Sequence, residues 1–538
     1  MKLWILFLST LLSAQITLDE LSQRPPSHAK NFLIWQFLQQ DITPAEADTA
    51  FDQIENVNTK LFFLYAKKTD RPEIAYIAKC MNLPASELLK TDDNNCLQIA
   101  ITPWGAALYT KPQIKELESR VFVPKTKRYL DIMSSDMNES TLLKYAPSDI
   151  LTVMNGAGKK YREDHFNHKY SQEFIDHISK SSKISQLVEA TINDSAMDQF
   201  TPLLLNINPK FLDNSSSFIM AIHYLLDEKK ELALKYLDIS NKKALSQKDK
   251  DKTIFWKYLI TNDTAYLKQI ALSMDINIYT LYAKEILGLE VTNYFTQEQN
   301  DLAQMEDSQN IKDPFAWMKI KKEIKHASTE NLFLLSSVYE EKSNLPLEGL
   351  TLEKAHAYKL HSFIMPYSQY TASLSNDEKA FVYALMRQES QFIPSAISSS
   401  YALGLMQLMP FLVDALNKQM PNKTSSYSDM FNPQMNISYA IKHLSWLNSQ
   451  LDNPLFKAYA YNGGLGFTKR YIKSGKFTCK EYEPFLSMDT MSNIESREYG
   501  KKVLANYAIY KKILKEDFSI VHFFDRLKEE KHISHPAE

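Results

Sequence analysis

The stretch that decides the fold of the C-terminal part runs from residue 375 to residue 392 and reads SNDEKAFVYALMRQESQF. Its first four residues, Ser-Asn-Asp-Glu, form a capping box, a pattern that starts a helix. Phe381, Leu385 and Glu389 follow at spacings of four residues, so they share one stripe of that helix. Pro394 lies just beyond and ends the helix. The sequence therefore predicts a helix that carries the carboxyl group of Glu389 toward an apolar face.

Burial at that face would make the carboxyl group of Glu389 suitable as a general acid. A carboxylate that loses hydration has a raised pKa and holds a proton near neutral pH, as a general acid must. The alternative is a carboxylate that simply ends the helix in solvent. A negative charge near a helix C-terminus opposes the helix dipole, however, and exposure would also waste the apolar stripe. We therefore expect Glu389 to be catalytic.

The length and composition indicate a helical protein of more than one domain. A chain of 538 residues is too long for one hydrophobic core. It contains only 11 glycines and shows no regular alternation of valine and isoleucine, so we expect an all-α protein. The net charge of -2, with both signs interspersed, gives no footprint for nucleic acid and no basic patch for a membrane surface.

The first 14 residues read MKLWILFLSTLLSA, a lysine before a short apolar run that ends in small residues. This pattern predicts a secretory signal peptide with cleavage after Ala14. The run is too short to span a membrane. A retained anchor is the alternative, because Leu12 makes the cleavage site imperfect.

The three cysteines allow two arrangements, one disulfide with one free thiol or three free thiols. Cys80 and Cys96 are close enough in sequence to pair in an oxidising compartment, which would leave Cys479 over. Three free, partly buried thiols are an equally open reading. We expect no metal site, because the clustered histidines lack a cysteine or carboxylate frame. These histidines are His165, His168 and His177.

From about residue 28 to residue 365 the chain resembles a succession of helical hairpins. Apolar residues repeat at helical spacing over residues 216–237 and 253–289, and polar turns at 241–243 and 261–263 separate the helices. No strict repeat period is present, so the pattern predicts an irregular α-superhelix or solenoid. A compact helical domain without a binding role is the alternative.

The helices after Glu389 are expected at positions set by proline, glycine and capping residues. One starts at Pro410, another follows Pro433, and a short one over 456–461 ends at Gly463. A second capping box, Ser492 to Glu495, predicts a helix to about residue 514. We therefore divide the chain into a signal peptide (1–14), a superhelical domain with linker (15–365), a second helical domain (366–515) and a polar tail (516–538).

Four motifs in one order carry a family resemblance. They are Arg-Gln-Glu-Ser from Arg387, Gly-Leu-Met-Gln from Gly404, Ala-Tyr-Asn from Ala460 and Glu-Ser-Arg-Glu-Tyr from Glu495. Together they resemble the soluble lytic transglycosylase family, which cleaves the glycan strands of bacterial peptidoglycan. The resemblance covers residues 370 to 515. The N-terminal half is similar only in its general helical character. It implies an α-superhelix followed by a lysozyme-like catalytic domain.

The resemblance also implies roles for single residues. Glu389 matches the catalytic acid and base, and Tyr461 matches a tyrosine that reaches toward it. Ser398 stands where the family has a polar residue near that carboxylate, and Gln407 and Met409 match residues that line the cleft. The residues expected to bind substrate are Ser398, Gln407, Met409, Tyr461, Asn462 and Glu495.

Several of these residues could have a purely structural role instead of binding substrate. Met409 and Tyr461 could be core residues. Glu495 could serve only as the capping-box residue of its own helix. The position of Ser398 could shift by one or two within the serine run. Tyr401 departs from the family, which has a small residue there, and so leaves the shape of one cleft wall open.

The implied reaction uses one carboxyl group, whereas ordinary glycosidases use two. Protonated Glu389 would cleave the bond between N-acetylmuramic acid and N-acetylglucosamine, then help the C6 hydroxyl close a 1,6-anhydro ring, with neither metal nor cofactor. A lysozyme-type hydrolase and a non-catalytic glycan-binding scaffold are the alternatives. We expect a monomer that acts on peptidoglycan strands in the periplasm of a Gram-negative bacterium.

Overall fold

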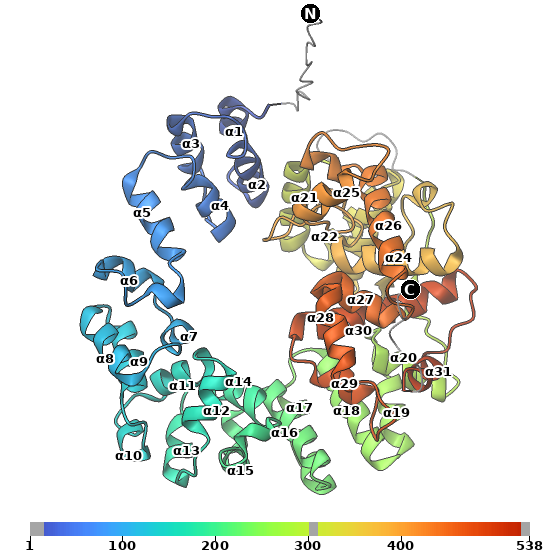
Figure 1. Ribbon diagram of the computed structural model, residues 1–538. Coiled ribbons are helices and arrows are strands. Elements are labelled where there is room, and N and C mark those ends of the chain that lie inside the picture. The colour runs from blue at the N-terminus through green and yellow to red at the C-terminus, as the bar shows by residue number, and fades with distance from the viewer. Residues whose placement is uncertain (1–14, 301–309, 529–538) are drawn as a thin grey trace, which may run out of the picture. The chain divides into compact units, whose positions relative to one another are not determined.

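The computed structural model describes residues 15–300 and 310–528, and helices make up nearly all of their regular structure (Figure 1). The strands β1 (Tyr294–Phe295) and β2 (His361–Ser362) form one small parallel pair. The expected all-α class is confirmed. The expected signal peptide lies outside the described residues. None of the helices within those residues is both long enough and apolar enough to cross a membrane.

The chain forms two compact units. The first, which we call the motif unit, gathers the described residues of Met1–Ile42, Asp48–Val57 and Leu267–Glu538. The second, the hairpin unit, contains Thr43–Ala47 and Asn58–Tyr266. All four motifs lie in the motif unit, together with residues 267–365. The expected division at residue 365 therefore stays a prediction.

The hairpin unit is a run of short helices that pack on their neighbours in sequence. Its pair α16 and α17 confirms the helices expected over 216–237. The turn expected at 241–243 is wrong, because α17 continues through Lys243. Lysines suit the last turn of a helix, where they complement its dipole. The helices between residues 44 and 271 are α3 (Pro44–Phe51), α4 (Thr59–Tyr65), α5 (Pro72–Met81), η1 (Ala85–Glu87), α6 (Asn94–Ala100), α7 (Pro103–Ala106), α8 (Lys111–Arg120), α9 (Pro124–Ser134), α10 (Glu139–Leu142), α11 (Pro147–Gly156), α12 (Lys159–Phe166), α13 (Gln172–Ile178), α14 (Ile184–Thr191), η2 (Ser195–Met197), α15 (Thr201–Leu204), η3 (Pro209–Phe211), α16 (Asn214–Leu226), α17 (Lys230–Lys243), α18 (Gln247–Thr261) and α19 (Thr264–Ala271).

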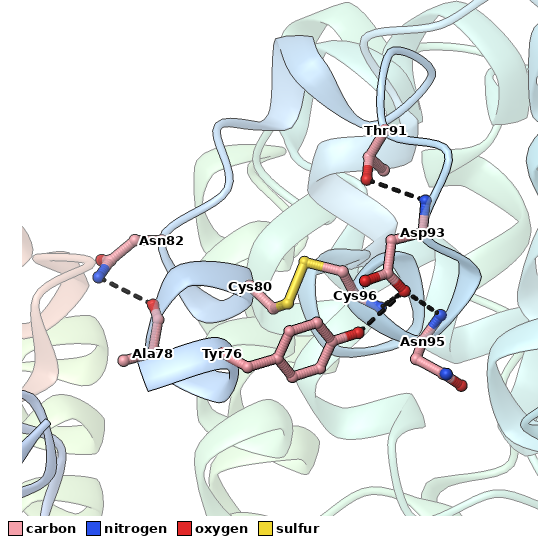
Figure 2. Close-up of a disulfide and its surroundings, with 8 residues drawn as sticks. All are labelled: Tyr76, Ala78, Cys80, Asn82, Thr91, Asp93, Asn95 and Cys96. Carbon is pink, nitrogen blue, oxygen red and sulfur yellow. Dashed lines mark hydrogen bonds between the residues drawn. A yellow bond between two sulfur atoms is a disulfide. The ribbon is translucent and has the colours of Figure 1, made fainter. Parts of the chain in front are cut away.

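A disulfide joins two helices of the hairpin unit. Cys80 in α5 and Cys96 in α6 are bonded, with their Cα atoms 4.9 Å apart (Figure 2). Asp93 caps α6 by accepting hydrogen bonds from the amides of Asn95 and Cys96, and it also accepts one from the hydroxyl of Tyr76. Of the two open alternatives, the structure has the disulfide rather than three free thiols, and Cys479 is a free, exposed thiol.

The motif unit is built around α30, which packs against both α24 and α27. The expected starts at Pro410 and Pro433 and the end after Gly463 are confirmed. The helices and strands of this unit are α1 (Leu18–Gln23), α2 (His28–Phe37), α20 (Ile278–Ile286), β1, α21 (Pro314–His326), α22 (Thr329–Glu341), α23 (Leu345–Ala355), β2, η5 (Ser368–Tyr370), α24 (Asn376–Ser390), α25 (Pro410–Asn417), η6 (Tyr427–Phe431), α26 (Pro433–Asn448), α27 (Pro454–Gly463), α28 (Leu465–Lys473), α29 (Phe485–Thr490), α30 (Ile494–Ile513) and α31 (Ile520–Arg526).

Two local expectations near the C-terminus are wrong. The cap of α30 is Asn493, whose side chain accepts the amide of Ser496, and not Ser492. The segment from residue 516 is not only a polar tail, because α31 buries Phe523 and Phe524. The ring of Phe524 packs on Phe485 with centroids 4.7 Å apart, so apolar burial fixes this helix.

Candidate active site

Glu389 lies in the last turn of α24, and the capping box expected at Ser375 starts that helix. Phe381 and Leu385, on the same stripe, are buried, and Glu389 is half-buried. The hydroxyl of Tyr499 in α30 donates a 2.6 Å hydrogen bond to Oε1 of Glu389. The stripe therefore carries the carboxyl group to the interior side of the helix, as the sequence predicts.

Burial raises the pKa of the Glu389 carboxyl group to about 7. Two smaller effects oppose each other. The hydrogen bond from Tyr499 lowers this pKa, because it stabilises the charged form, and the negative charge of Glu495 raises it. The group can therefore hold a proton at neutral pH and also release it, which suits an acid that becomes a base.

Arg387 fixes the end of α24 that carries Glu389. Its guanidinium donates to the carbonyl of Ser362 at 2.9 Å, to Oδ1 of Asn506 at 2.9 Å and to Oε1 of Glu353 at 2.7 Å. It also lies over the ring of Phe363, 4.2 Å from the ring centroid. Arg387 of the first motif is therefore a structural anchor that ties α24 to β2, α23 and α30.

Tyr461 lies at the end of α27, close enough to Glu389 to feel its charge. Burial first, and the charge of Glu389 second, raise the pKa of the Tyr461 hydroxyl well above its ordinary value. That hydroxyl donates a 2.7 Å hydrogen bond to the carbonyl of Met406. The structure therefore brings Tyr461 beside Glu389, but the tyrosine bonded to the carboxyl group is Tyr499.

The second motif forms a tight turn opposite α26. Gly404 has a φ of +74° in the left-handed region, and a Cβ there would lie 2.3 Å from Nδ2 of Asn436. Asn436 donates to the carbonyl of Leu403 at 3.0 Å and accepts from the amide of Met406 at 2.9 Å. The glycine is therefore required both by the backbone angle and by this buried amide.

Gln407 and Met409 follow the turn and are half-buried, whereas Met406 is fully buried. The Nε2 of Gln407 donates to the carbonyls of Ala396 at 3.0 Å and Gly404 at 2.8 Å. The side chain of Gln407 thus ties the turn together. Met406 belongs to the core, and Met409, just before α25, keeps part of its surface open.

Ser398 shapes a neighbouring turn. Its Oγ accepts hydrogen bonds from the amides of Ser400 at 3.2 Å and Ala402 at 2.9 Å. Its carbonyl bonds to Nε2 of His28 at 2.6 Å. In the described part of the chain, the hydroxyl of Ser398 has these amides as partners rather than Glu389.

Asn462 and Glu495 meet at the ends of two helices. The Nδ2 of Asn462 donates to Oε1 of Glu495 at 3.0 Å, and the hydroxyl of Ser496 donates to Oδ1 of Asn462 at 2.8 Å. Glu495 is exposed in the first turn of α30. The capping-box alternative for Glu495 is wrong, because the helix begins one residue later than that box requires.

Tyr401, the residue that departs from the family pattern, is buried beneath α2. Its ring centroid lies 5.6 Å from that of His28, 5.5 Å from that of Phe32 and 5.4 Å from that of Trp35. Its φ of +63° places it in the left-handed region. Tyr401 thus anchors α2 to the turn before the second motif.

Tyr499 is the residue that sequence reasoning missed. It is the last residue of the fourth motif and lies four positions after Glu495, so both share one face of α30. Gly500 lets α30 approach α27, since a Cβ there would lie 2.2 Å from Cε1 of Tyr459. That close approach of the helices helps set the place of Tyr499, and the motif spacing was the available signal.

Within residues 15–300 and 310–528, no group of three or more His, Cys, Asp or Glu side chains is arranged to hold a metal ion. The groups that act on Glu389 are the hydroxyl of Tyr499, the hydroxyl of Tyr461 and the carboxylate of Glu495. This arrangement can bind a neutral, hydroxyl-rich molecule and transfer one proton to or from it.

Comparisons with known proteins find similar sequences and structures. Residues 366–483 match the family model described as the transglycosylase SLT domain. A putative soluble lytic murein transglycosylase of Haemophilus influenzae is 35% identical over 178 residues, 32% of this chain and 29% of that protein. A membrane-bound lytic murein transglycosylase C of Cronobacter sakazakii is 31% identical over 172 residues, 29% of this chain and 48% of that protein. The chain thus spans less than half the length of either relative.

Two crystal structures share the fold along most of the chain. The lytic transglycosylase Slt of Pseudomonas aeruginosa matches with a TM-score of 0.51 over 93% of this chain and 89% of that one. The 70 kDa soluble lytic transglycosylase of Escherichia coli matches with a TM-score of 0.53 over 93% of this chain and 83% of that one. Both are 14% identical, so they establish the fold alone. The match at residues 366–483 therefore gives the C-terminal part of the chain, which contains Glu389, its similarity to the transglycosylase SLT domain.

Proposed function

We propose that the protein is a lytic transglycosylase of peptidoglycan. It cleaves the β-1,4 bond between N-acetylmuramic acid and N-acetylglucosamine and leaves a 1,6-anhydromuramic acid end. The observation that carries this proposal is the carboxyl group of Glu389, whose burial raises its pKa to about 7 beside the hydroxyl of Tyr499. Such a group can give up a proton and then take one back within a single catalytic cycle.

In the first step, Glu389 acts as the acid. Its proton passes to the glycosidic oxygen, the bond from that oxygen to C1 of the muramic acid breaks, and N-acetylglucosamine leaves with a free hydroxyl. The muramyl N-acetyl group, or an oxocarbenium-like state, carries the positive charge at C1. Tyr499 supports this step, because its hydrogen bond stabilises the carboxylate that forms on Glu389.

In the second step, the same residue acts as the base. Ionised Glu389 takes the proton from the C6 hydroxyl, whose oxygen attacks C1 and closes the 1,6-anhydro ring. Proton and bonds balance, and no water is consumed. The other carboxylate felt at Glu389 belongs to Glu495, which is exposed and bonded to Asn462. That position suits support of the site better than the second carboxylate of an ordinary glycosidase.

Substrate contacts are proposed for the residues around Glu389. The half-buried side chains of Gln407, Met409 and Tyr461 would line the cleft. Asn462 and Glu495 would border it from the ends of α27 and α30. Ser398 would act through the turn that its hydroxyl holds together.

We place the enzyme in the periplasm of a Gram-negative bacterium, acting as a monomer on peptidoglycan strands. The expected signal peptide at residues 1–14 would export it. The disulfide between Cys80 and Cys96 supports an oxidising compartment. The division into a superhelical domain to residue 365 and a catalytic domain from residue 366 belongs to the same proposal.

The test is digestion of purified peptidoglycan followed by mass spectrometry of the released fragments. We expect muropeptides that end in 1,6-anhydromuramic acid. Fragments with reducing muramic acid ends would instead identify a lysozyme-type hydrolase, in which water replaces the C6 hydroxyl. Binding of the glycan without release of fragments would favour a non-catalytic scaffold.

A further inference from the structure

Three aromatic rings form a strip that leads away from Glu389 within the motif unit. The strip begins at Tyr461, which is near enough to Glu389 to feel its charge. The ring of His443 lies 5.7 Å from that of Tyr461, centroid to centroid. The ring of Trp446 then stacks on His443 at 5.6 Å with an interplanar angle of 25°. We call these three residues the aromatic strip.

The far end of the aromatic strip is open to solvent. Trp446 is 49% exposed, whereas Trp256 in the hairpin unit is completely buried. His443 is half-buried, and burial lowers the pKa of its imidazole, so the ring is uncharged at neutral pH. The strip therefore offers flat, uncharged ring surface beside the proposed catalytic residue.

Polar side chains lie close to the end of α26 that carries these rings. His443 and Trp446 are three residues apart on one side of α26, and Gln450 follows two residues after the helix ends. The Nζ of Lys469 in α28 donates a 2.8 Å hydrogen bond to Oε1 of Gln450. Apolar ring faces bordered by a few amide and ammonium groups are the combination that binds sugars, which have one apolar face and a rim of hydroxyls.

We propose that the aromatic strip is a binding subsite for a sugar unit of the glycan strand beyond the bond that is cleaved. Trp446 would stack on the apolar face of this sugar. A glycan strand is the proposed occupant because the aromatic strip adjoins Glu389 through Tyr461, so a strand bound at Glu389 and running in this direction would lie on it. This inference rests on the proposed function and extends it to substrate length, since a strand must be long enough to reach Trp446.

The test measures binding without cleavage. Soluble glycan strands of defined length are titrated into the Glu389→Gln protein by calorimetry, with and without a change at Trp446. We expect Trp446→Ala to weaken binding of long strands by roughly three- to tenfold, which is the size of one stacking contact. Trp446→Tyr, which keeps a ring, should restore most of the affinity. A disaccharide, too short to reach the strip, should bind equally to all variants.

Trp104→Ala is the matched control, since Trp104 is also an exposed tryptophan, at 60%, but lies in the hairpin unit. It should leave long-strand binding unchanged. Equal affinity of Trp446→Ala and its parent for the longest strands would overturn the subsite. If the wild-type protein still released anhydro ends, the proposed function would stand without it. Reducing ends from the wild type, together with weaker binding by Trp446→Ala, would keep the subsite and overturn the proposed reaction.

Discussion

Polar contacts in the hairpin unit join segments that are close in sequence, whereas those in the motif unit join segments that are far apart. In the hairpin unit, Asn214 bonds to Ser240, 26 residues away, and Lys159 bonds to Asp194, 35 residues away. Each of these separations is about the number of residues in one pair of helices. Each hairpin is therefore stabilised mainly by the next one along the chain.

The site in the motif unit is held by contacts between residues that are far apart in the sequence. Tyr499 bonds to Glu389 across 110 residues, and Arg387 bonds to Asn506 across 119. The hydroxyl of Tyr279 bonds to Asp489 across 210 residues. The comparison teaches that a substitution in the hairpin unit should remain local, while one in the motif unit should disturb several elements that meet at Glu389.

The largest expected difference between the units concerns their ion pairs. Lys501 and Asp489 are buried, with side chains 4% and 1% exposed and 2.7 Å between Nζ and Oδ1. Lys501→Met would leave the charge of Asp489 buried and should cost about 3–5 kcal/mol of unfolding free energy. Lys159→Met in the hairpin unit removes an ammonium that is 66% exposed and should cost less than about 1 kcal/mol. Urea unfolding measures both, and equal costs would break the comparison.

The next prediction concerns how the folding stability depends on pH through the ionisation of Glu389. Its pKa is about 7 in the folded protein and near 4.5 when unfolded, so folding favours the protonated form. Wild-type stability therefore falls as pH rises between those two values. Glu389→Gln does not titrate and should be about 1–3 kcal/mol more stable than wild type at pH 8, with no such gain at pH 4. Thermal unfolding at both pH values checks this, and an equal difference at both would contradict the raised pKa.

Tyr499→Phe should change the pH dependence of catalysis. The hydrogen bond from Tyr499 lowers the pKa of Glu389, so its loss raises that pKa further. The descending limb of the kcat/KM profile should move to higher pH, and the rate should fall about tenfold. Tyr507→Phe is the matched control on the same helix, because the Tyr507 hydroxyl bonds to Asp377 instead. A limb that moves to lower pH would refute the assignment.

The smallest effect is expected from Glu495→Gln. It should shift the pH profile in the direction opposite to the shift caused by Tyr499→Phe. The charge of Glu495 raises the pKa of Glu389, so its removal should move the same limb to lower pH. Glu495 is exposed, so we expect only a small shift, which becomes smaller still at high salt. A kinetic profile at two salt concentrations measures it, and a large salt-independent shift would mean a more direct role.

Sequence reasoning succeeded where the information was local. The helix with Glu389 is set by its capping box and apolar stripe, and the structure has both. It failed at α30, where Ser492 and Asn493 are both good cap residues. Nothing local chooses between them, whereas Asn462, 33 residues earlier, engages Glu495 in the structure. The cap was therefore decided by a tertiary contact.

The surroundings of Glu389 show the same limit. Ser398 is expected near the carboxylate, and this stays a prediction. In the structure its hydroxyl accepts from the amides of Ser400 and Ala402, and its carbonyl bonds to His28, 370 residues away in sequence. Tyr401, which departs from the family pattern, packs against Phe32 of α2. No periodicity can reveal such a partner. Tyr499 was within reach of sequence reasoning, because it shares a helix face with Glu495.

If Glu389 handles the proton in glycan cleavage, replacing its carboxyl group by an amide should stop the release of fragments. The release of 1,6-anhydromuramic acid ends from purified peptidoglycan is compared between wild type and Glu389→Gln by mass spectrometry. We predict that the rate falls by about a thousandfold or more, while the variant stays folded and still binds glycan strands. Release by the folded variant at a rate close to that of the wild type would contradict the account.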